Sequence, residues 1–334
     1  MSAPELLSPS ELIVMAAYGD GLAASPVGER PYLLCRPERG LEPQAAQQVA
    51  AWLRERPCPV IGVTRADAAD PALAGACDVL LDPGHSLDGL LANIVATPLA
   101  AMTLTQVLRV TEHMALADAL IVESLGFAAL QNGPEFRAWL ARRHPDPEPD
   151  DARAPPLRLS RDGARLDIVL DRPDSRNSID RRLRDALVEA LELVRADETI
   201  TEAVLSAAGR CFSIGGDLGE FGRTPDPATA HMIRTVRSPA MALARVANRL
   251  TVRVHGVSIG AGVELAAFAS RVIAAPGSTF QLPELSMGLI PGAGGCISVP
   301  RRIGRQRTAL LALSGRRISV ATALEWGLVD AIDG

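Results

Sequence analysis

The sequence predicts an α/β fold in which short strands, glycine turns and helices alternate along the chain. Segments such as CPVIGV and LTVRVHG are rich in β-branched residues, which are typical of strands. Residues 43–55 instead place apolar side chains at helical spacing. Glycine turns lie at SIGGD and SIGAG, next to strand and helix patterns. Repeated units of this kind are typical of a layered architecture of sheets and helices.

The N-terminal region, residues 1–143, begins with an α/β pattern. RPYLLCR predicts a short strand, and residues 43–55 predict a helix with Val49 and Leu53 on one side. CPVIGV and CDVLLD predict two further strands. From 86 to 143 the pattern becomes helical, with breaks near Pro98 and near residues 132–134, because proline and Asn-Gly sequences interrupt helices.

A domain boundary is expected at residues 144–156, which read HPDPEPDDARAPP. Proline removes backbone donors and blocks helix formation, and clustered acidic side chains repel one another. The composition therefore predicts a linker between the N-terminal region and a C-terminal region at 157–334.

The C-terminal region repeats the alternation of strands, turns and helices. In order, it predicts a strand at RLDIVLDRP, a helix over 180–195, a strand over 203–208 and a helical stretch around 228–248. Strand LTVRVHG, helix VELAAFAS and strand RVIAA follow, and PGAGG precedes another helix.

Composition argues against several classes of function. The net charge is −5, aromatic residues make up 3% of the chain and no basic block occurs, so no nucleic-acid partner is expected. No apolar run is long enough for a membrane span, and the first residues lack the pattern of a signal peptide. The five cysteines form no C-x-x-C pair, so we expect reduced, buried thiols in a cytoplasmic protein.

Two glycine turns carry the first chemical signal. Glycines in IGGDLGEF free the backbone to adopt positive φ and to expose amide N–H groups. In IGAGVELA a glycine turn enters a helix, whose first amides have no partner within the helix. Two such amides aimed at one point would form an oxyanion hole for a thioester carbonyl that becomes an enolate.

Two glutamates accompany these turns. Glu264 lies in the helix that leaves the second turn, and Glu284 follows a proline in FQLPELSMG. If both reach one water molecule, repulsion between them raises one pKa, so that one group donates a proton while the other accepts one. The alternatives are a solvated helix residue for Glu264 and a cap of a short helix for Glu284.

Five ordered motifs over about 160 residues resemble the enoyl-CoA hydratase/isomerase (crotonase) family. They are RPDSRNSID, GRCFSIGGDL, VHGVSIGAGVELA, FQLPELSMGLIPGAGGCISVPRRIG and LSGRRISVATALEWGLVDAI. The spacing between the two glutamates also matches that family. The resemblance implies an α/β, crotonase-like spiral of β-β-α units, the ClpP/crotonase fold, preceded here by an N-terminal α/β and helical region.

The resemblance also implies residue roles. Gly216 and Ala261 would donate the oxyanion amides, and Glu264 and Glu284 would hold and activate water. Many family members have alanine where this chain has Gly216, and we expect the difference to be tolerated because only the amide is used. The substrate-binding residues would be Gly215, Asp217, Leu218 and Gly219 at the acyl thioester end and Arg176 near the phosphates of coenzyme A.

The expected activity is that of a hydro-lyase, which adds water syn to a 2-enoyl-CoA. No metal or redox cofactor is implied, because coenzyme A is part of the substrate, and relatives are commonly trimer-based homo-oligomers. One alternative is another crotonase reaction, either isomerisation or hydrolysis of the thioester. The other is a catalytically silent subunit that binds acyl-CoA. Residues 220–245 and the N-terminal helices are expected to form the pocket walls.

The chain departs from the family pattern because it stops at Gly334, where ordinary members continue with further helices. Residues 86–143 resemble those helices. This order is consistent with a circular permutation or with an eroded tandem copy, in which the helices fold onto this core or onto a neighbouring subunit.

Other motifs favour no competing chemistry. GVSIG fits the G-x-S-x-G pattern of serine hydrolases, but the last histidine, His255, precedes Ser258, which is the wrong order for that fold. The histidines are dispersed and show no metal-ligand spacing. PGAGG lacks the Lys-Ser/Thr of a phosphate loop, and residues 301–307 predict a charged helix face, with contact to a phosphate of coenzyme A as the alternative.

Overall fold

The strands of the C-terminal half form a six-stranded sheet in the order β12-β9-β7-β6-β5-β4. The computed structural model describes residues 5–19, 24–28, 30–143 and 155–333. All neighbours in this sheet are parallel except β4 and β5, which form an antiparallel hairpin. The strands are β4 (Leu157–Asp162), β5 (Arg165–Leu170), β6 (Glu202–Ala207), β7 (Leu250–Val254), β9 (Arg271–Ala274) and β12 (Ala331–Ile332).

A second, smaller sheet follows the first along the chain. It has the order β11-β10-β8 and contains β8 (Val257–Ile259), β10 (Thr279–Gln281) and β11 (Ile318–Ser319). From β7 the chain enters β8, passes through a helix to β9 and then enters β10. Each turn therefore adds one strand to each sheet, which is the spiral of β-β-α units expected from the sequence.

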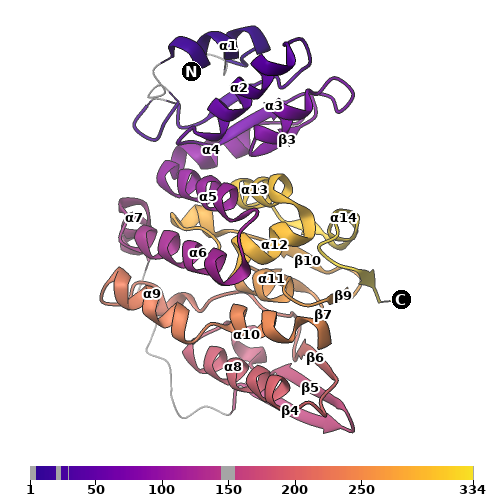
Figure 1. Cartoon of the computed structure of the whole chain (residues 1–334). Helices are drawn as coiled ribbons and strands as arrows, with labels where there is room; N and C mark the ends of the chain where they lie inside the picture. Colours follow the sequence, from indigo (N-terminus) through magenta and orange to yellow (C-terminus); the bar gives the residue numbers. More distant parts are fainter. Residues whose placement is uncertain (1–4, 20–23, 29, 144–154, 334) are drawn as a thin grey trace.

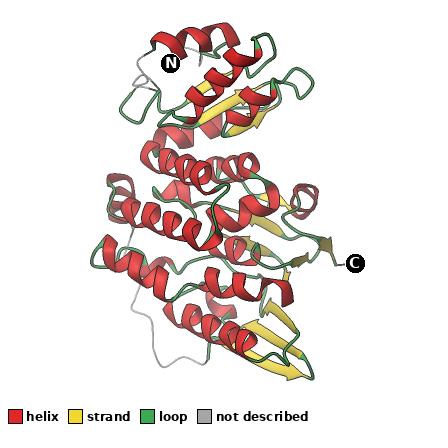
Figure 2. Cartoon of the chain, viewed as in Figure 1, coloured by secondary structure: helices red, strands yellow, loops and turns green. Residues whose placement is uncertain are grey.

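The helices of this half cover the sheets on one side (Figure 2). They are α8 (Arg181–Ala196), α9 (Pro227–Val236), α10 (Pro239–Val246), α11 (Ala261–Ala266), α12 (Gly295–Ile303), α13 (Arg305–Ser314) and α14 (Val320–Trp326). The single helical stretch expected at 228–248 is wrong, because it is divided into α9 and α10. Pro239 cannot donate a backbone hydrogen bond, and Ser238 Oγ accepts one from Met241 N at 3.1 Å to begin α10.

A third sheet belongs to the N-terminal region. It is parallel, has the order β1-β2-β3, and comprises β1 (Leu33–Cys35), β2 (Val60–Val63) and β3 (Val79–Leu81), as predicted. One face packs on apolar residues of α1 (Pro9–Tyr18), α2 (Pro43–Arg54) and α3 (Pro71–Ala76). The other face joins a hydrophobic core that continues into the C-terminal half.

Four further helices connect this sheet to the C-terminal half. They are α4 (Asp88–Ala96), α5 (Pro98–Thr111), α6 (Leu116–Gln131) and α7 (Pro134–Ala141), with breaks at the predicted proline and Asn-Gly positions. In this chain α5 and α6 pack on α12, α4 and α5 pack on α13, and α6 packs on α9 (Figure 1). The expected linker at 144–156 lies, except for its last two residues, outside the described residues.

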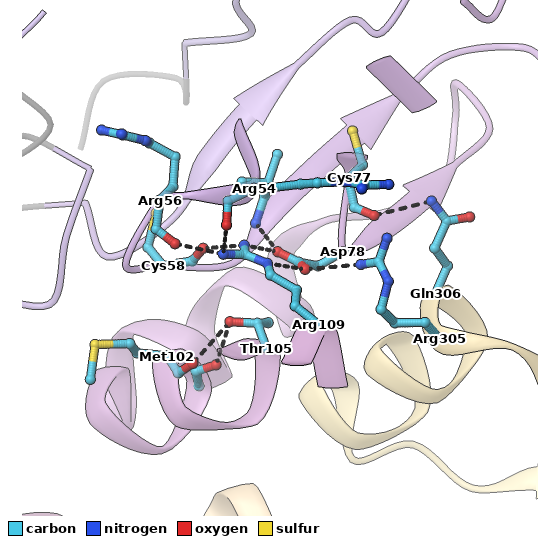
Figure 3. Close-up of polar contacts among 12 residues, drawn as sticks. Arg54, Arg56, Cys58, Cys77, Asp78, Met102, Thr105, Arg109, Arg305 and Gln306 are labelled. Atoms are coloured by element: carbon cyan, nitrogen blue, oxygen red, sulfur yellow. Dashed lines mark hydrogen bonds and ion pairs between the residues drawn. The ribbon is translucent and has the colours of Figure 1, made fainter. Parts of the chain in front are cut away.

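A buried charge cluster, the Asp78 junction, joins the N-terminal sheet to the C-terminal half (Figure 3). The carboxylate of Asp78 is 1% exposed and accepts hydrogen bonds from Arg109 of α5, at 2.8 and 2.5 Å, and from Arg305 of α13, at 3.1 Å. Val60 N donates a further bond at 2.8 Å. The prediction that residues 301–307 form a charged surface face is therefore wrong for Arg305, whose guanidinium is buried among partners from the N-terminal region.

The described cysteines are buried, as expected. Within the described ranges, no single helix is long and apolar enough to cross a bilayer. Helices α4 and α5 reach that length only as a pair, which bends by 104°.

Candidate active site

The residues that the sequence predicted for the site all line one pocket of about 1400 Å³. Its walls also include residues of α6, α7, α9 and α10, so both the 220–245 segment and the N-terminal helices contribute, as expected. The predicted residues that line the pocket are Arg176, Gly215, Gly216, Asp217, Leu218, Gly219, Ala261, Glu264 and Glu284.

The two glycine turns lie side by side. Gly215 has φ of +90°, and a Cβ at this position would lie 2.8 Å from Ile259 O and 3.4 Å from Ala261 N. Only glycine allows the first turn to approach the second this closely. Ser213 also forms a parallel bridge with Ser258, which ties the two segments together before the turns begin.

The buried side chain of Asn177 ties its own turn to the segment that leads into the first glycine turn. It accepts a hydrogen bond from Arg172 N at 2.9 Å and donates to Ala208 O at 2.9 Å and Cys211 O at 3.1 Å. Asn177 and Arg176 both have φ of 54°, in the left-handed region where asparagine is tolerated better than most residues. The turn that carries Arg176 is therefore held by fixed polar contacts.

The amides of Gly216 and Ala261 are both available to a ligand. Among the described residues, neither N–H group has a hydrogen-bond partner. Ala261 opens α11 after Gly260, which has φ of +51°, so its N–H is one of the unpaired amides of a helix start. Two free donors on adjacent turns can hold an oxygen that develops negative charge.

Glu264 is fixed within the pocket by backbone amides. It is 2% exposed, and its Oε2 accepts hydrogen bonds from Ala293 N at 2.7 Å and Gly295 N at 2.9 Å. Burial raises the pKa of Glu264 to about 7, although these amides and the charge of Arg234 oppose the increase. A carboxyl group with this pKa can accept a proton near neutral pH.

Glu284 is held against the second glycine turn. It is 7% exposed, and a Cβ on Gly260 would lie 2.5 Å from its Oε1. Its Oε2 is buried without a hydrogen-bond partner in the described part of the chain. Burial, and then the charge of Glu264, raises the pKa of Glu284 well above its usual value. The raised pKa favours the protonated form of Glu284, which can donate a proton.

The remaining predicted residues shape the first turn. Asp217 Oδ1 accepts a hydrogen bond from Gly219 N at 2.8 Å, and its Oδ2 accepts one from Ser178 Oγ at 3.0 Å. The carboxylate of Asp217 thus holds the backbone rather than standing free for substrate. Leu218 is 40% exposed at the pocket and accepts a hydrogen bond on its carbonyl oxygen from Arg143 at 2.7 Å.

A third buried glutamate, Glu123 of α6, was missed by sequence reasoning. It is 2% exposed, and its oxygens accept hydrogen bonds from Gly294 N at 2.7 Å and Cys296 N at 2.8 Å. Burial, and then the charge of Glu264, raises the pKa of Glu123 to about 8. The only local signal is an acidic residue between the apolar residues Val122 and Leu125 in a helical pattern.

Helix α7 adds an aromatic wall that the sequence did not identify. Phe136 and Trp139 stack with ring centroids 5.7 Å apart, and Trp139 lies 6.2 Å from Phe221 after the first glycine turn. This cluster joins the N-terminal helices to the loop that carries the site. Within the described residues, no group of histidine, cysteine and acidic side chains could hold a metal ion.

Comparison with known proteins finds relatives of the C-terminal half. The family model described as enoyl-CoA hydratase/isomerase matches residues 162–334. The chain is 33% identical over 177 residues to 2,3-dehydroadipyl-CoA hydratase of Escherichia coli, covering 53% of this chain and 68% of that protein. It is 34% identical over 168 residues to 1,2-epoxyphenylacetyl-CoA isomerase of the same organism, covering 49% and 64%.

Solved structures give the same result. An enoyl-CoA hydratase/isomerase from Mycobacterium paratuberculosis superposes with a TM-score of 0.50 at 31% identity, over 55% of this chain and 74% of that one. The chain thus spans about two thirds of the length of the curated relatives. The matched segment contains both turns, Glu264 and Glu284, whereas Glu123 lies outside it. From its β-β-α spiral and this match, the chain belongs to the enoyl-CoA hydratase/isomerase family.

Proposed function

We propose that this protein adds water across the C2–C3 double bond of a 2-enoyl-CoA thioester. The observation that carries this proposal is the pair of buried carboxylates, Glu264 and Glu284, in the pocket that also receives two unpartnered amides. Burial raises the pKa of both carboxyl groups, that of Glu264 to about 7, and the proposal assigns Glu264 the role of base and Glu284 the role of acid.

In this proposal the thioester oxygen lies between the N–H groups of Gly216 and Ala261. As the reaction proceeds, the carbonyl becomes an enolate and its oxygen gains negative charge. Fixed backbone donors stabilise that charge without having to reorganise, and one such donor typically contributes about 3 kcal/mol to the transition state.

The ionised carboxylate of Glu264 takes a proton from water while the water oxygen bonds to C3. The π electrons of the double bond move toward the thioester and form the enolate. Protonated Glu284 then delivers its proton to C2, and the enolate electrons return to restore the carbonyl. Proton transfer from Glu264 to Glu284 resets the site. The proposal places both groups on the same side of the double bond, so that the addition is syn.

Binding of the coenzyme A portion is assigned to the mouth of the pocket. Arg176 is proposed to lie near its phosphates, and Gly215, Leu218 and Gly219 to line the thioester end. Asp217 holds this turn in shape through its bonds to Gly219 and Ser178. The chemistry uses proton transfer alone, so the proposal includes no metal or redox cofactor.

The names of the relatives favour this class of reaction and also define its main competitor. A hydratase, a carnitinyl-CoA dehydratase and an isomerase are all about one third identical to this chain. Isomerisation would use the same oxyanion amides but would move a proton between carbons without adding water. Analysis of the product therefore separates the two reactions.

The test is turnover of crotonyl-CoA by the wild type and by the E264Q and E284Q variants. We expect the wild type to form 3-hydroxybutyryl-CoA and each variant to lose about 10²–10⁴-fold in kcat, with a smaller change in KM. E325Q, which changes an exposed glutamate of α14, is the matched control and should keep full activity. Undiminished hydration in both site variants would refute the two-carboxylate mechanism, and an isomerised product would favour the competitor.

A further inference from the structure

Helix α7 gathers its largest side chains on one face. Residues three or four positions apart lie on the same side of a helix. Along α7 and just beyond its end, the residues at this spacing are Phe136, Trp139, Leu140 and Arg143. The face therefore presents two aromatic rings, an aliphatic side chain and a cation to the elements beside it. It lies outside residues 162–334, which the family model matches.

One end of α7 packs against the segment that carries Glu284. Gly288 ends the short helix that begins at Glu284 and has φ of +71°. A Cβ at Gly288 would lie 2.6 Å from Glu135 Cβ and 2.7 Å from Phe136 N, so only glycine allows this approach. Leu289 then donates its N–H to the backbone oxygen of Glu284 at 3.1 Å. The start of α7 thus limits where the backbone of Glu284 can lie.

The aromatic rings of α7 reach the first glycine turn. The ring of Trp139 stacks on that of Phe136, with centroids 5.7 Å apart, and lies 6.2 Å from that of Phe221 at an angle of 56°. The rings of Phe136 and Phe221 are 6.4 Å apart. Phe221 in turn lies over Gly216, where a Cβ would be 3.1 Å from Cε1 of the ring. The three rings form one cluster, and its far side rests on the backbone that carries the first proposed oxyanion amide.

Two more contacts hold the same loop to α7. A Cβ on Gly222, which has φ of +81°, would lie 2.8 Å from Cδ1 of Leu140. Arg143 donates from NH1 to the carbonyl oxygen of Leu218 at 2.7 Å, and its guanidinium lies 5.0 Å from the ring centroid of Trp139. The loop from 218 to 222 is therefore fixed to α7 at both of its ends.

Helix α7 is itself fixed to the N-terminal region. The carboxyl oxygens of Glu135 accept hydrogen bonds from Leu99 N at 2.7 Å and Ala100 N at 3.0 Å, at the start of α5. Helix α7 also packs on α6 (Figure 1), and Phe136 is fully buried. Its position is therefore set in part by contacts outside the site.

We propose that α7 sets the spacing between the amide of Gly216 and the carboxyl group of Glu284, and that Trp139 is the positioning residue in this contact. The inference rests on the proposed function for the roles of Gly216 and Glu284. Trp139 fills the space between α7 and the Phe221 ring, so its loss leaves a gap into which Phe221 and the turn beneath it can move. A shift of about 1 Å at such a turn can lower turnover by about 10²-fold.

The direct test measures kcat and KM of W139A and W139F with crotonyl-CoA and trans-2-decenoyl-CoA. We expect W139A to lower kcat about 10- to 100-fold for both substrates, with a smaller change in KM. W139F keeps a ring in the cluster and should recover most of the lost activity. A loss that is confined to one chain length, or that appears mainly in KM, would show that Trp139 contacts the acyl-CoA directly and would overturn the positioning role.

Trp326 of α14 provides a matched control. Like Trp139 it is half-buried, and it lies 5.7 Å from the guanidinium of Arg307, but it is not among the described residues that line the pocket. W326A should keep the wild-type kcat although it also loses an indole ring. Thermal unfolding of W139A and W326A checks that both remain folded at the assay temperature. An equal fall of kcat in both would assign the effect to a general loss of stability and contradict the proposal.

A double-mutant cycle tests the route through Phe221. If Trp139 acts on Gly216 through the Phe221 ring, W139A and F221A remove the same contact. The double variant should then lose no more kcat than the more affected single variant. Losses that multiply would mean that the two rings act independently, against the proposed route.

Binding of acetoacetyl-CoA separates this proposal from the proposed function. Its enolate absorbs in the near ultraviolet, and amide donors at the thioester oxygen favour that form without any hydration step. At saturating acetoacetyl-CoA, we expect W139A to lower the enolate-to-keto ratio about 10-fold and W326A to leave it unchanged. An unchanged ratio in W139A would overturn the inference. If the wild type hydrates neither enoyl-CoA, the hydratase proposal fails, while this ratio still reports whether Trp139 positions the amide of Gly216.

Discussion

At the scale of single residues, adjacent glycines in the first turn have different reasons to be glycine. Gly215 has positive φ, and a Cβ there would strike the backbone oxygen of Ile259 at 2.8 Å. A Cβ on Gly216 would meet only the side chain of Phe221, at 3.1 Å, which can shift. Glycine is therefore required at 215 by the close approach of the two turns. At 216 the surroundings allow a small side chain, and only the backbone amide is used in the proposed function.

G215A and G216A test this difference. We expect G215A to destabilise the fold by about 1–3 kcal/mol, because alanine is strained at this φ, and to displace the oxyanion amides. A displacement of about 1 Å can lower turnover by about 10²-fold. G216A should fold normally and keep most of its activity in the crotonyl-CoA assay. Equal behaviour of the two variants would contradict this assignment.

At the scale of elements, the start of α12 is held by two carboxylates from different parts of the chain. Glu264 accepts the N–H groups of Ala293 and Gly295, and Glu123 accepts those of the intervening Gly294 and of Cys296. Four consecutive amides at a helix start therefore donate to carboxyl oxygens, which supplies partners that these amides cannot find within the helix. Helix α6 thus positions the backbone that orients Glu264.

E123Q tests this positioning role. A glutamine would turn its own N–H group toward one of the two amides, so we expect a loss of about 1.5–3 kcal/mol of stability and a lower kcat. Glu123 is not among the groups that shift the pKa of Glu264, so the acid limb of the pH–rate profile should stay in place while kcat falls.

The pH–rate profile is the decisive measurement for Glu123. E325Q again serves as the control, since it removes a glutamate far from α12 without altering the helix start. A kcat that keeps its wild-type value across the profile while stability falls would assign Glu123 a purely structural role, and an acid limb that moves would contradict the assignment of the pKa of Glu264 to its own burial.

At the scale of the whole molecule, the N-terminal region and the C-terminal half share buried charges as well as a hydrophobic core. Asp78 accepts hydrogen bonds from Arg109 and Arg305, and Gln306 Nε2 donates to Cys77 O at 3.1 Å (Figure 3). The pocket therefore receives α6 and α7 in a fixed position. Removal of Asp78 would leave the guanidinium of Arg109 partly buried without its ion-pair partner and Arg305 with only Glu112, at 3.1 Å.

D78N is expected to lower the free energy of unfolding by about 3–5 kcal/mol, because two guanidinium groups lose their shared anion. Urea denaturation provides the measurement. D67N is the control, since the Arg65–Asp67 pair is 74% and 71% exposed and should contribute little. If D78N is as stable as D67N, the Asp78 junction does not hold the two regions together.

The free energy of unfolding should also decrease as pH rises, because buried carboxyl groups bind protons more tightly in the folded chain. The pKa values of Glu264 and Glu123 rise from 4.5 to about 7 and about 8 on folding, so the folded chain binds more protons than the unfolded chain between these limits. Stability is therefore greatest at the acid side of this window and falls as pH rises from about 5 to about 8. Urea midpoints across this range check the sign, and E123Q should show a smaller decline. A rise in stability across the window would contradict these pKa directions.

The sequence by itself determined the alternation of strands, glycine turns and helices and the two glutamates beside the turns, and the family resemblance added the spiral. Each depends on local chemistry: glycine allows positive φ, β-branched residues favour strands, and Glu264 and Glu284 lie in short segments whose turns fix their direction. The break before α10 was missed although Ser238 and Pro239 carry a local signal.

Only the tertiary structure decided which distant residues join the site. Glu123 accepts a hydrogen bond from Gly294, which is 171 positions away in the sequence. The guanidinium of Arg234 packs against the ring of Phe127 from another helix. Arg305, in a segment that reads as a charged surface, is buried because Asp78 meets it from the N-terminal sheet. Such contacts follow from packing between elements, and no local period or propensity encodes a partner so far along the chain.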